Sequence, residues 1–187
     1  MTHKLVGNWN GGLAFDLHIT GSIYLGVDDQ GHKQFDNTRS EMGELVYQLK
    51  YGGDQSTVPK IIELLKGIEG LETLDVIIPV PSSQTRAFQP VDVIAQALGN
   101  QRGVPVLISH LTKAGNAQLK NITDPVERTN ALANISVSGK TDISGKKVLL
   151  LDDLYDSGAT LNACCNVLKQ QSNVNEIWVL TMTKTRG

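Results

Sequence analysis

The chain has 187 residues, which is enough for one domain that buries its own hydrophobic core. Its 17 Lys and Arg residues stand against 19 Asp and Glu residues, and the formal net charge of -2 excludes the basic surface of a general nucleic-acid binder. The two cysteines, Cys164 and Cys165, are neighbours without a disulfide framework, and no segment approaches about 18 uninterrupted apolar residues, so we expect a cytoplasmic protein that does not cross a membrane.

Residues 1–70 are expected to form an N-terminal cap or hood. Residues 5–31 are rich in glycine and carry short apolar runs between turn residues, which indicates a hairpin or an irregular cap. Amphipathic helices are predicted over Met42–Lys50, with Ser40 as the N-cap residue, and over Thr57–Lys66. These two helices would form a lid over the rest of the chain.

Residues 71–187 are expected to form the core of the protein as a single compact unit. Strands that alternate with helices predict an α/β fold with an open, mostly parallel sheet flanked by helices, and ligands bind at the carboxyl ends of such strands. A polar segment, Thr112–Asp124, interrupts the alternation, and a loop of this length is usually functional or disordered. The predicted strands are Leu74–Val80, Val104–Leu111, Asn134–Val137, Val148–Leu151 and Glu176–Thr183, and the predicted helices are Gln89–Leu98, Val126–Ala133 and a segment that begins after Thr160.

The segment Val148–Thr160 carries the strongest functional pattern. An unalternated apolar run predicts a strand buried on both faces, and Asp152 and Asp153 follow at its carboxyl end. A loop with Ser157 and Gly158 then leads into a helix, whose first backbone N–H groups are suited to bind a phosphate. Carboxylates can hold hydroxyl groups or a hydrated cation beside that phosphate. The pattern therefore favours a sugar phosphate as the ligand.

This stretch resembles the phosphoribosyl pyrophosphate (PRPP) signature of the type I phosphoribosyltransferases, over thirteen positions in register. That signature is a hydrophobic strand, two acidic residues, two loosely defined positions and a phosphate loop that ends in Thr. A buried strand that ends in a solvated acidic turn is the simplest alternative. A receiver-type phosphoacceptor strand usually lies near the start of its chain, and a Walker-type loop needs a Gly-Lys-Ser/Thr ending that is absent here.

The order of several shorter motifs narrows the resemblance to the ComF family of phosphoribosyltransferase-like proteins, over roughly residues 42–185. This chain departs from that family in two features. The N-terminal four-cysteine zinc module that is usual in the family is absent here, and Asp156 stands where many members have Thr. The motifs are Leu49-Lys50-Tyr51, Pro79-Val80-Pro81, Arg86-Ala87-Phe88-Gln89, Gln118-Leu119 and Glu127-Arg128-Thr129-Asn130.

The resemblance implies a Mg-dependent phosphoribosyltransferase, which transfers the 5-phosphoribosyl group of PRPP to a base or amine and releases pyrophosphate. It assigns the ribose hydroxyls to Asp152 and Asp153, which are also the possible protein ligands of a magnesium ion that enters with PRPP. The 5-phosphate would lie on Asp156, Ser157, Gly158, Ala159 and Thr160. The pyrophosphate would lie on Val80, Pro81, Ser82, Ser83 and Arg86.

Three residues are catalytic candidates by this resemblance, and each has a simpler alternative. Arg86 would stabilise the leaving pyrophosphate, or it is a surface charge beside a helix. Lys113 would contact phosphate from the long loop, or it is an exposed loop lysine. Asp156 would serve a nucleobase, or it is an N-cap carboxylate. Lys50 and Tyr51 would contribute to the site, or they only end the lid helix.

A second function class stays open at the level of sequence. The fold can keep a PRPP loop without catalysis, so the chain could be a PRPP-binding regulator or an accessory protein linked to DNA uptake or processing. A PRPP synthetase would need a second similar domain, and no internal repeat is visible. The expected partners are PRPP and an unidentified base or amine, with no membrane and no direct nucleic-acid signal, and the sequence allows a homodimer without specifying one.

Overall fold

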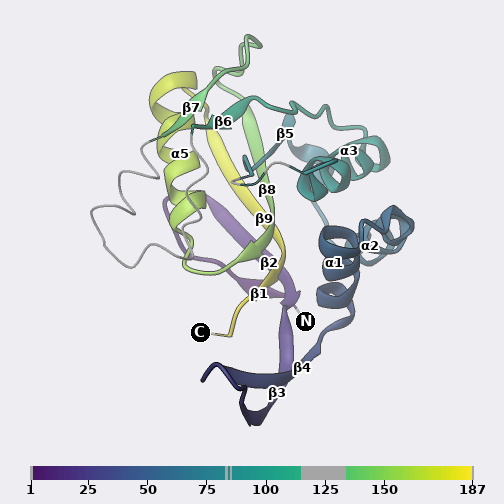
Figure 1. Ribbon diagram of the computed structural model, residues 1–187. Helices are drawn as coiled ribbons and strands as arrows, with labels where there is room; N and C mark the ends of the chain where they lie inside the picture. Colours follow the sequence, from purple (N-terminus) through teal and green to yellow (C-terminus); the bar gives the residue numbers. More distant parts are fainter. Residues whose placement is uncertain (1, 83, 85, 115–133, 187) are drawn as a thin grey trace.

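A five-stranded sheet forms the centre of the molecule, in a computed structural model that describes residues 2–82, 84, 86–114 and 134–186 (Figure 1). The strand order is β1-β2-β9-β8-β5, and every neighbouring pair is parallel except β1 and β2. This confirms the predicted α/β fold with a mostly parallel sheet. The strands of this sheet are β1 (His3–Lys4), β2 (Gly11–Leu17), β5 (Val76–Pro79), β8 (Lys147–Tyr155) and β9 (Glu176–Lys184).

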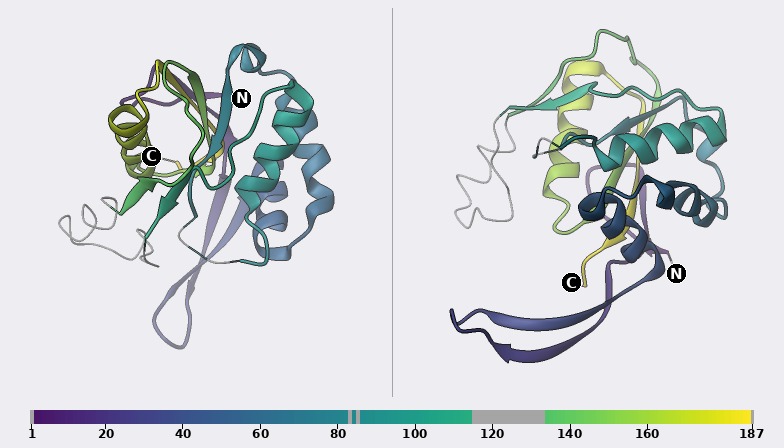
Figure 2. Two further views of the ribbon diagram at one scale, coloured as in Figure 1. Left: turned by 90° about the horizontal axis from the view of Figure 1, so that it is seen from above. Right: turned by 45° about the vertical axis from the view of Figure 1, so that its right-hand side comes forward.

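The strand β8 is central because helices cover it on both faces, as its unalternated apolar run predicts. Leu149 and Leu151 face the core cluster that α1, α2 and α3 cover, whereas Val148 and Leu150 face the cluster that α5 covers. Figure 2 shows these helices on opposite sides of the sheet. All four apolar side chains are at most 1% exposed, so β8 can position the residues at its carboxyl end accurately.

The helices begin and end close to the predicted residues. The Ser40 side chain accepts a hydrogen bond of 3.0 Å from the Gly43 N–H and caps the first helix, which ends before Gly53 at a positive φ of 67°. The helices are α1 (Glu41–Gly52), α2 (Val58–Leu65), α3 (Pro90–Arg102) and α5 (Ala159–Ser172), with short 3-10 turns at Gln55–Thr57 and Leu71–Thr73. Within the described residues, none of these helices is long and apolar enough to span a membrane.

The predicted strand Val104–Leu111 is wrong. Only Val106 in this stretch makes a parallel bridge, to Ile77 of β5. Pro105 has no N–H group to donate, and Ser109 has a left-handed φ of 58°, so a regular ladder cannot continue. A short antiparallel pair follows instead, formed by β6 (Leu111–Lys113) and β7 (Ile135–Val137). The predicted helix Val126–Ala133 and most of the segment Thr112–Asp124 lie outside the described residues.

The N-terminal region contributes more to the sheet than a cap would. The strand β2 lies between β1 and β9, with Leu13 in register with Leu180, so the sheet draws on both sides of the predicted division at residue 70. The predicted hairpin is present further along the chain, as β3 (Ile19–Val27) and β4 (Lys33–Arg39). Among the described elements before residue 70, this hairpin, the helices α1 and α2 and the 3-10 turn at Gln55–Thr57 lie outside the central sheet.

The buried face of β8 gives the first prediction. Leu150→Ala removes a side chain that is 0% exposed and should lower the free energy of unfolding by about 2–5 kcal/mol. Val6→Ala is the matched control, because Val6 is exposed, and its effect should stay within about 0.5 kcal/mol. Urea unfolding monitored by circular dichroism measures both values. Equal effects of the two substitutions would contradict the central position of β8.

Candidate functional site

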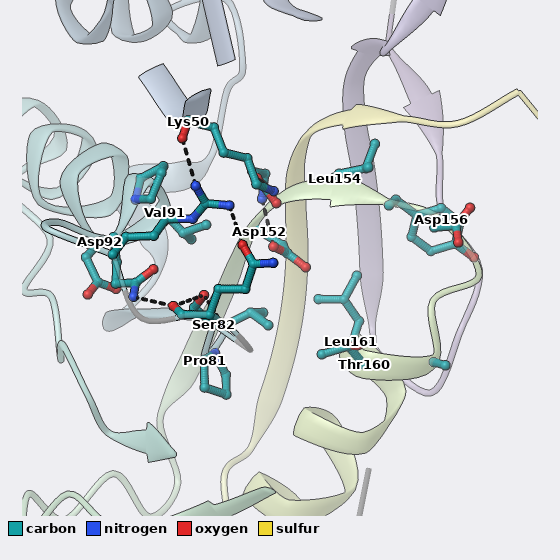
Figure 3. Close-up of a pocket in the computed structure, with 18 of the residues that line it drawn as sticks. Lys50, Pro81, Ser82, Val91, Asp92, Asp152, Leu154, Asp156, Thr160 and Leu161 are labelled. Carbon is teal, nitrogen blue, oxygen red and sulfur yellow. Dashed lines mark hydrogen bonds and ion pairs between the residues drawn. The ribbon is translucent and has the colours of Figure 1, made fainter. Parts of the chain in front are cut away.

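A cavity of about 410 Å³ opens at the carboxyl ends of β5 and β8. In Figure 3, Lys50 of α1 lies on one side of this cavity, Asp156 and Thr160 on another, and Pro81 and Ser82 below. The cavity therefore brings together the three predicted subsites, for ribose, phosphate and pyrophosphate. Its lining residues are Lys50, Tyr51, Val80, Pro81, Ser82, Gln84, Arg86, Gln89, Pro90, Val91, Asp92, Asp152, Asp153, Leu154, Tyr155, Asp156, Ser157, Gly158, Ala159, Thr160 and Leu161.

The two carboxylates at the end of β8 have different surroundings. Side chains alternate along a strand, so Asp153 points toward the helix layer of α1 and α3, whereas Asp152 points toward α5. The Asp153 N–H donates a 2.8 Å hydrogen bond to Asp152 Oδ1. Burial, followed by the negative charge of Asp153, raises the pKa of Asp152 well above its usual range. Asp152 therefore binds a proton more readily than an ordinary aspartate, whereas Asp153 forms an ion pair with Lys50.

Lys50 is a residue of the cavity whose contact with the acidic pair its local sequence does not indicate. It lies near the end of α1, and its ammonium group forms an ion pair with Asp153 Oδ2. Burial by itself would lower the pKa of Lys50, but the nearby Asp153 carboxylate raises it overall. A charged lysine therefore lies inside the cavity, against one of the two acidic residues.

Arg86 is fixed at the same end of α1. Its Nη1 donates a 2.9 Å hydrogen bond to the Lys50 carbonyl oxygen, and its Nη2 donates a 2.6 Å bond to Gln84 Oε1. Its guanidinium carbon lies 5.5 Å from the centre of the Tyr51 ring. A guanidinium group at a helix C-terminus is favoured by the free carbonyl groups and by the helix dipole. Arg86 is thus a fixed cation on the cavity wall rather than a free surface charge.

The turn after β5 lies next to Arg86. The Gln84 N–H donates to Ser82 Oγ at 3.1 Å, and the Ser82 hydroxyl donates to the Gln84 carbonyl oxygen at 3.0 Å. Val80 and Pro81 also line the cavity, as predicted. Ser83, another predicted pyrophosphate-binding residue, lies outside the described residues.

The predicted phosphate loop connects β8 to α5. Gly158 is the N-cap residue of α5, with a positive φ of 75°, and it has no side chain that could bond the first N–H groups of the helix. Asp156 is not the N-cap residue, because Gly158 holds that position, and the Asp156 Oδ1 accepts a 3.1 Å hydrogen bond from Thr185 Oγ1. The N-terminal end of α5 faces the cavity beside Ser157 and Thr160, and the Ala159 N–H donates a long, 3.5 Å hydrogen bond to Ser157 Oγ.

Lys113 lies outside the main cavity. It lines a neighbouring cavity of about 230 Å³, which shares Pro81, Ser82, Gln89 and Asp92 with the main one. Burial lowers the pKa of Lys113. The lysine is thus partly buried near the predicted pyrophosphate turn.

Several lining residues were not predicted as site residues. Gln84 holds Arg86, and Asp92 lies in the first turn of α3, where burial raises its pKa. The Tyr155 ring lies beside Gly158, with ring atoms 2.9 Å from where a Cβ at that position would lie. Lys50 belongs only to the short motif Leu49-Lys50-Tyr51, and its contact with Asp153 spans 103 residues. Gln84 carries no motif, and its contacts with Ser82, Arg86 and Gln89 are local.

The acidic pair could contribute to a metal site without completing one. Within the described ranges, no group of three or more His, Cys, Asp or Glu side chains is arranged to hold a metal ion. Asp152 and Asp153 supply hard oxygen donors of the kind that magnesium prefers, and magnesium commonly takes its other ligands from substrate and water. The residues fit a magnesium ion that arrives with a phosphate ligand.

Together these features define a class of protein: an α/β protein with a cavity at the carboxyl edge of a parallel sheet, lined by carboxylates, hydroxyl groups, a fixed cation and the start of a helix. A family model described as "Phosphoribosyl transferase domain" matches residues 54–181. The match spans more than half of the chain, so the chain belongs to this family of transferases.

Solved structures and curated proteins were also compared. The adenine phosphoribosyltransferase of Thermoanaerobacter pseudethanolicus has 15% identity and a TM-score of 0.47, and the alignment covers 87% of this chain and 95% of that one. The orotate phosphoribosyltransferase of Aeropyrum pernix has 16% identity and a TM-score of 0.45, with coverage of 87% and 77%. The phosphoribosylpyrophosphate synthetase of Mycobacterium smegmatis has 17% identity and a TM-score of 0.41, with coverage of 67% and 33%.

This chain thus spans only a third of the synthetase. Because all three TM-scores are below 0.5, these structures add no argument about substrate or mechanism. No curated protein matches the chain at a significant level.

Gly158 gives the second prediction. In Gly158→Ala, the new methyl group would meet the Tyr155 ring and the backbone would keep an unfavourable positive φ. Gly145→Ala is the matched control, because Gly145 has a similar φ of 70° but no atom near the added Cβ. We expect the control to lose about 1 kcal/mol of unfolding free energy and Gly158→Ala to lose more, together with affinity for ribose 5-phosphate. Equal losses in urea unfolding and unchanged calorimetric affinity would contradict this.

The pKa of Asp152 gives the third prediction. Because this pKa is raised on folding, the folded chain binds more protons than the unfolded chain above pH 3.8, so the contribution of Asp152 to stability falls as the pH rises. Asp152→Asn should therefore be more stable than wild type at pH 7, and the difference should shrink toward pH 4. Denaturation at several pH values measures it, with the exposed Asp29→Asn as control. A difference that grows toward low pH would contradict the assignment.

Proposed function

We propose that this chain is a Mg-dependent phosphoribosyltransferase, which binds PRPP in the cytoplasm and transfers the 5-phosphoribosyl group to a base or amine with release of pyrophosphate. The observation that carries the proposal is the position of Asp152 and Asp153 in one cavity with Arg86 and with the start of α5, whose N-cap residue Gly158 has no side chain. Membership of the phosphoribosyl transferase domain family supports it.

Each part of PRPP has a chemically suited partner in this cavity. The 5-phosphate would accept hydrogen bonds from the backbone N–H groups at the start of α5 and from the hydroxyls of Ser157 and Thr160. The ribose hydroxyls would donate to Asp152 and Asp153. The pyrophosphate would face Arg86, with the turn at Pro81 and Ser82 on its other side. Lys113 would approach that turn from the neighbouring cavity.

Phosphoribosyl transfer places positive charge on the sugar and increasing negative charge on the leaving pyrophosphate. A cation that is already fixed needs no reorganisation when that charge develops, which is how preorganised groups accelerate such reactions. Arg86 meets this requirement, because two hydrogen bonds hold its guanidinium group before any ligand binds. The carboxylates of Asp152 and Asp153 would stabilise the positive sugar. A magnesium ion held by the ligand and these carboxylates would neutralise pyrophosphate charge.

The acceptor is proposed only as a class. Asp156 lines the cavity, and one of its carboxylate oxygens accepts a hydrogen bond from the Thr185 hydroxyl. The other oxygen could accept a hydrogen bond from an N–H group of the acceptor. A base or an amine offers such a donor. The similarity in motif order to the ComF family supports the same cavity without identifying the acceptor.

The ion pair between Lys50 and Asp153 favours a second candidate function. Because the lysine already neutralises one of the two carboxylates, the site could bind PRPP without promoting transfer. The chain would then be a PRPP-binding regulator or accessory protein, and its similarity to the ComF family would connect it with DNA uptake or processing. The net charge of -2 gives no support for direct contact with DNA.

Arg86 gives the prediction that separates the two functions. If the chain is a transferase, Arg86→Ala should reduce the rate of pyrophosphate release on the order of 10²-fold and weaken PRPP binding less. The control Lys140→Ala changes an exposed lysine outside the cavity and should leave both quantities unchanged. The measurements are pyrophosphate release with PRPP, magnesium and a panel of bases and amines, and PRPP affinity by calorimetry.

Tight PRPP binding without release for any acceptor would favour the regulator. Absence of PRPP binding by the wild-type chain would contradict both functions.

A further inference from the structure

The segment that connects β1 to β2, residues 5–10, lies beside the helix that follows the predicted phosphate loop. Leu5 and Trp9 of this segment belong to the same buried core cluster as Leu161 and Cys165 of α5. The Trp9 indole N–H donates a 3.2 Å hydrogen bond to the Leu5 carbonyl oxygen, within the segment. The segment and α5 therefore cover the same face of the sheet.

The Trp9 ring anchors this segment to the core. The ring is buried, and two glycines allow the backbone to pass close to it. A Cβ atom at Gly7 would lie 2.2 Å from the ring atom Cη2, and one at Gly12 would lie 2.7 Å from Nε1. Asn8, the residue before the tryptophan, consequently has a fixed position.

Asn8 contacts α5 on successive turns of the helix. Its backbone N–H donates a 2.9 Å hydrogen bond to Asn162 Oδ1, and its side-chain Nδ2 donates a 3.2 Å bond to the Asn162 carbonyl oxygen. The same Nδ2 donates to Asn166 Oδ1, and the Lys169 ammonium group donates to the Asn8 carbonyl oxygen. A residue near the start of the chain therefore holds a helix that follows it by more than 150 positions.

Asn162 connects Asn8 to the first turn of α5. Its Nδ2 donates a 3.1 Å hydrogen bond to the Gly158 carbonyl oxygen, which also accepts the Asn162 backbone N–H at 2.9 Å. The partners determine the orientation of this side-chain amide, because the Asn8 backbone N–H can only donate and the Gly158 carbonyl can only accept. Asn162 thus bridges the N-terminal segment and the N-cap residue of α5.

The start of α5 needs such support. Helix ends fray, and the N-cap residue Gly158 combines a positive φ of 75° with the conformational freedom of a glycine. A phosphate bound there requires the first N–H groups of the helix to point in one direction, and ordering them only when the ligand arrives would lower the affinity. The Asn162 bridge orders this turn before binding.

We propose that Asn162 is a positioning residue for the 5-phosphate subsite, and that Asn8 holds it in place from the N-terminal segment. This inference rests on the proposed function, because it concerns the phosphate group of a PRPP-like ligand. In the described part of the chain, Asn162 is not among the residues that line the cavity. It therefore acts through Gly158 rather than by contact with the ligand.

Asn162→Ala removes the bridge, and Asn166→Ala is its matched control. Both variants replace an asparagine inside α5 that contacts Asn8, and both substitutions raise helix propensity by the same amount. Only Asn162→Ala removes a hydrogen bond to Gly158. A difference between the two variants therefore reports on the bridge, not on the general stability of the helix.

Hydrogen exchange in the ligand-free protein measures the positioning itself. Relative to their intrinsic rates, the amide groups of Ala163 and Cys164 should exchange at least about tenfold faster in Asn162→Ala than in wild type, because the first turn opens more often. Asn166→Ala should leave these rates unchanged. Equal rates in wild type and Asn162→Ala, or equal acceleration in both variants, would overturn the inference whatever the chain binds.

Calorimetry with two ligands measures the effect on binding. Ribose 5-phosphate should bind Asn162→Ala about tenfold more weakly than wild type, whereas magnesium pyrophosphate, which would lie near Arg86, should bind both equally. Asn8→Ala should weaken ribose 5-phosphate binding less than Asn162→Ala, because the backbone N–H of residue 8 remains.

The two kinds of failure are distinguishable. A wild-type chain that binds neither ligand would overturn the proposed function, and this inference with it, even if the exchange rates are as expected. Unchanged affinity of Asn162→Ala in a chain that does bind ribose 5-phosphate, or an equal loss of affinity for both ligands, would overturn this inference alone.

Discussion

Burial of β8 from both sides is the constraint on which the rest of the structure depends. Its apolar residues pack into two separate cores, one under α1, α2 and α3 and one under α5, and its backbone pairs with β5 and β9. A strand held in this way has little freedom at its carboxyl end. Asp152 and Asp153 occupy that end, and the alternation of side chains directs one carboxylate toward each helix layer. The core thus determines which neighbour each acidic residue meets.

The sequence predicts those parts of the site whose partners are close in the chain. Strand, acidic pair, loop and helix follow one another between Val148 and Thr160, and each is recognisable from local composition. The contact of Lys50 with Asp153 spans 103 residues, and that of Arg86 with the Lys50 carbonyl spans 36, so no local pattern could reveal them. The insertion of β2 beside β9 was missed for the same reason, since pairing between distant strands depends on the whole fold.

The helix α1 connects several regions that the chain keeps far apart. Its N-terminal end is capped by Ser40, immediately after the hairpin of β3 and β4, and its C-terminal end carries Lys50 and the carbonyl group that holds Arg86. One helix of 12 residues therefore links the base of the β3–β4 hairpin to the acidic pair and to the fixed cation. The position of α1 outside the sheet therefore places the Lys50 ammonium group, and the carbonyl group that holds Arg86, beside the cavity.

The ion pair of Lys50 and Asp153 also changes what loading the site involves. An acidic site without a counter-ion would gain positive charge when a metal cation bound. The fraction of such sites that is occupied would depend directly on the concentration of that cation. This cavity instead carries its own counter-ion, tethered by a side chain. Under the proposed function, entry of a metal-bound ligand at Asp153 would therefore be an ion exchange, in which the incoming cation displaces the Lys50 ammonium group from the carboxylate. Selectivity in such a site depends on the difference between two cations rather than on the strength of either one.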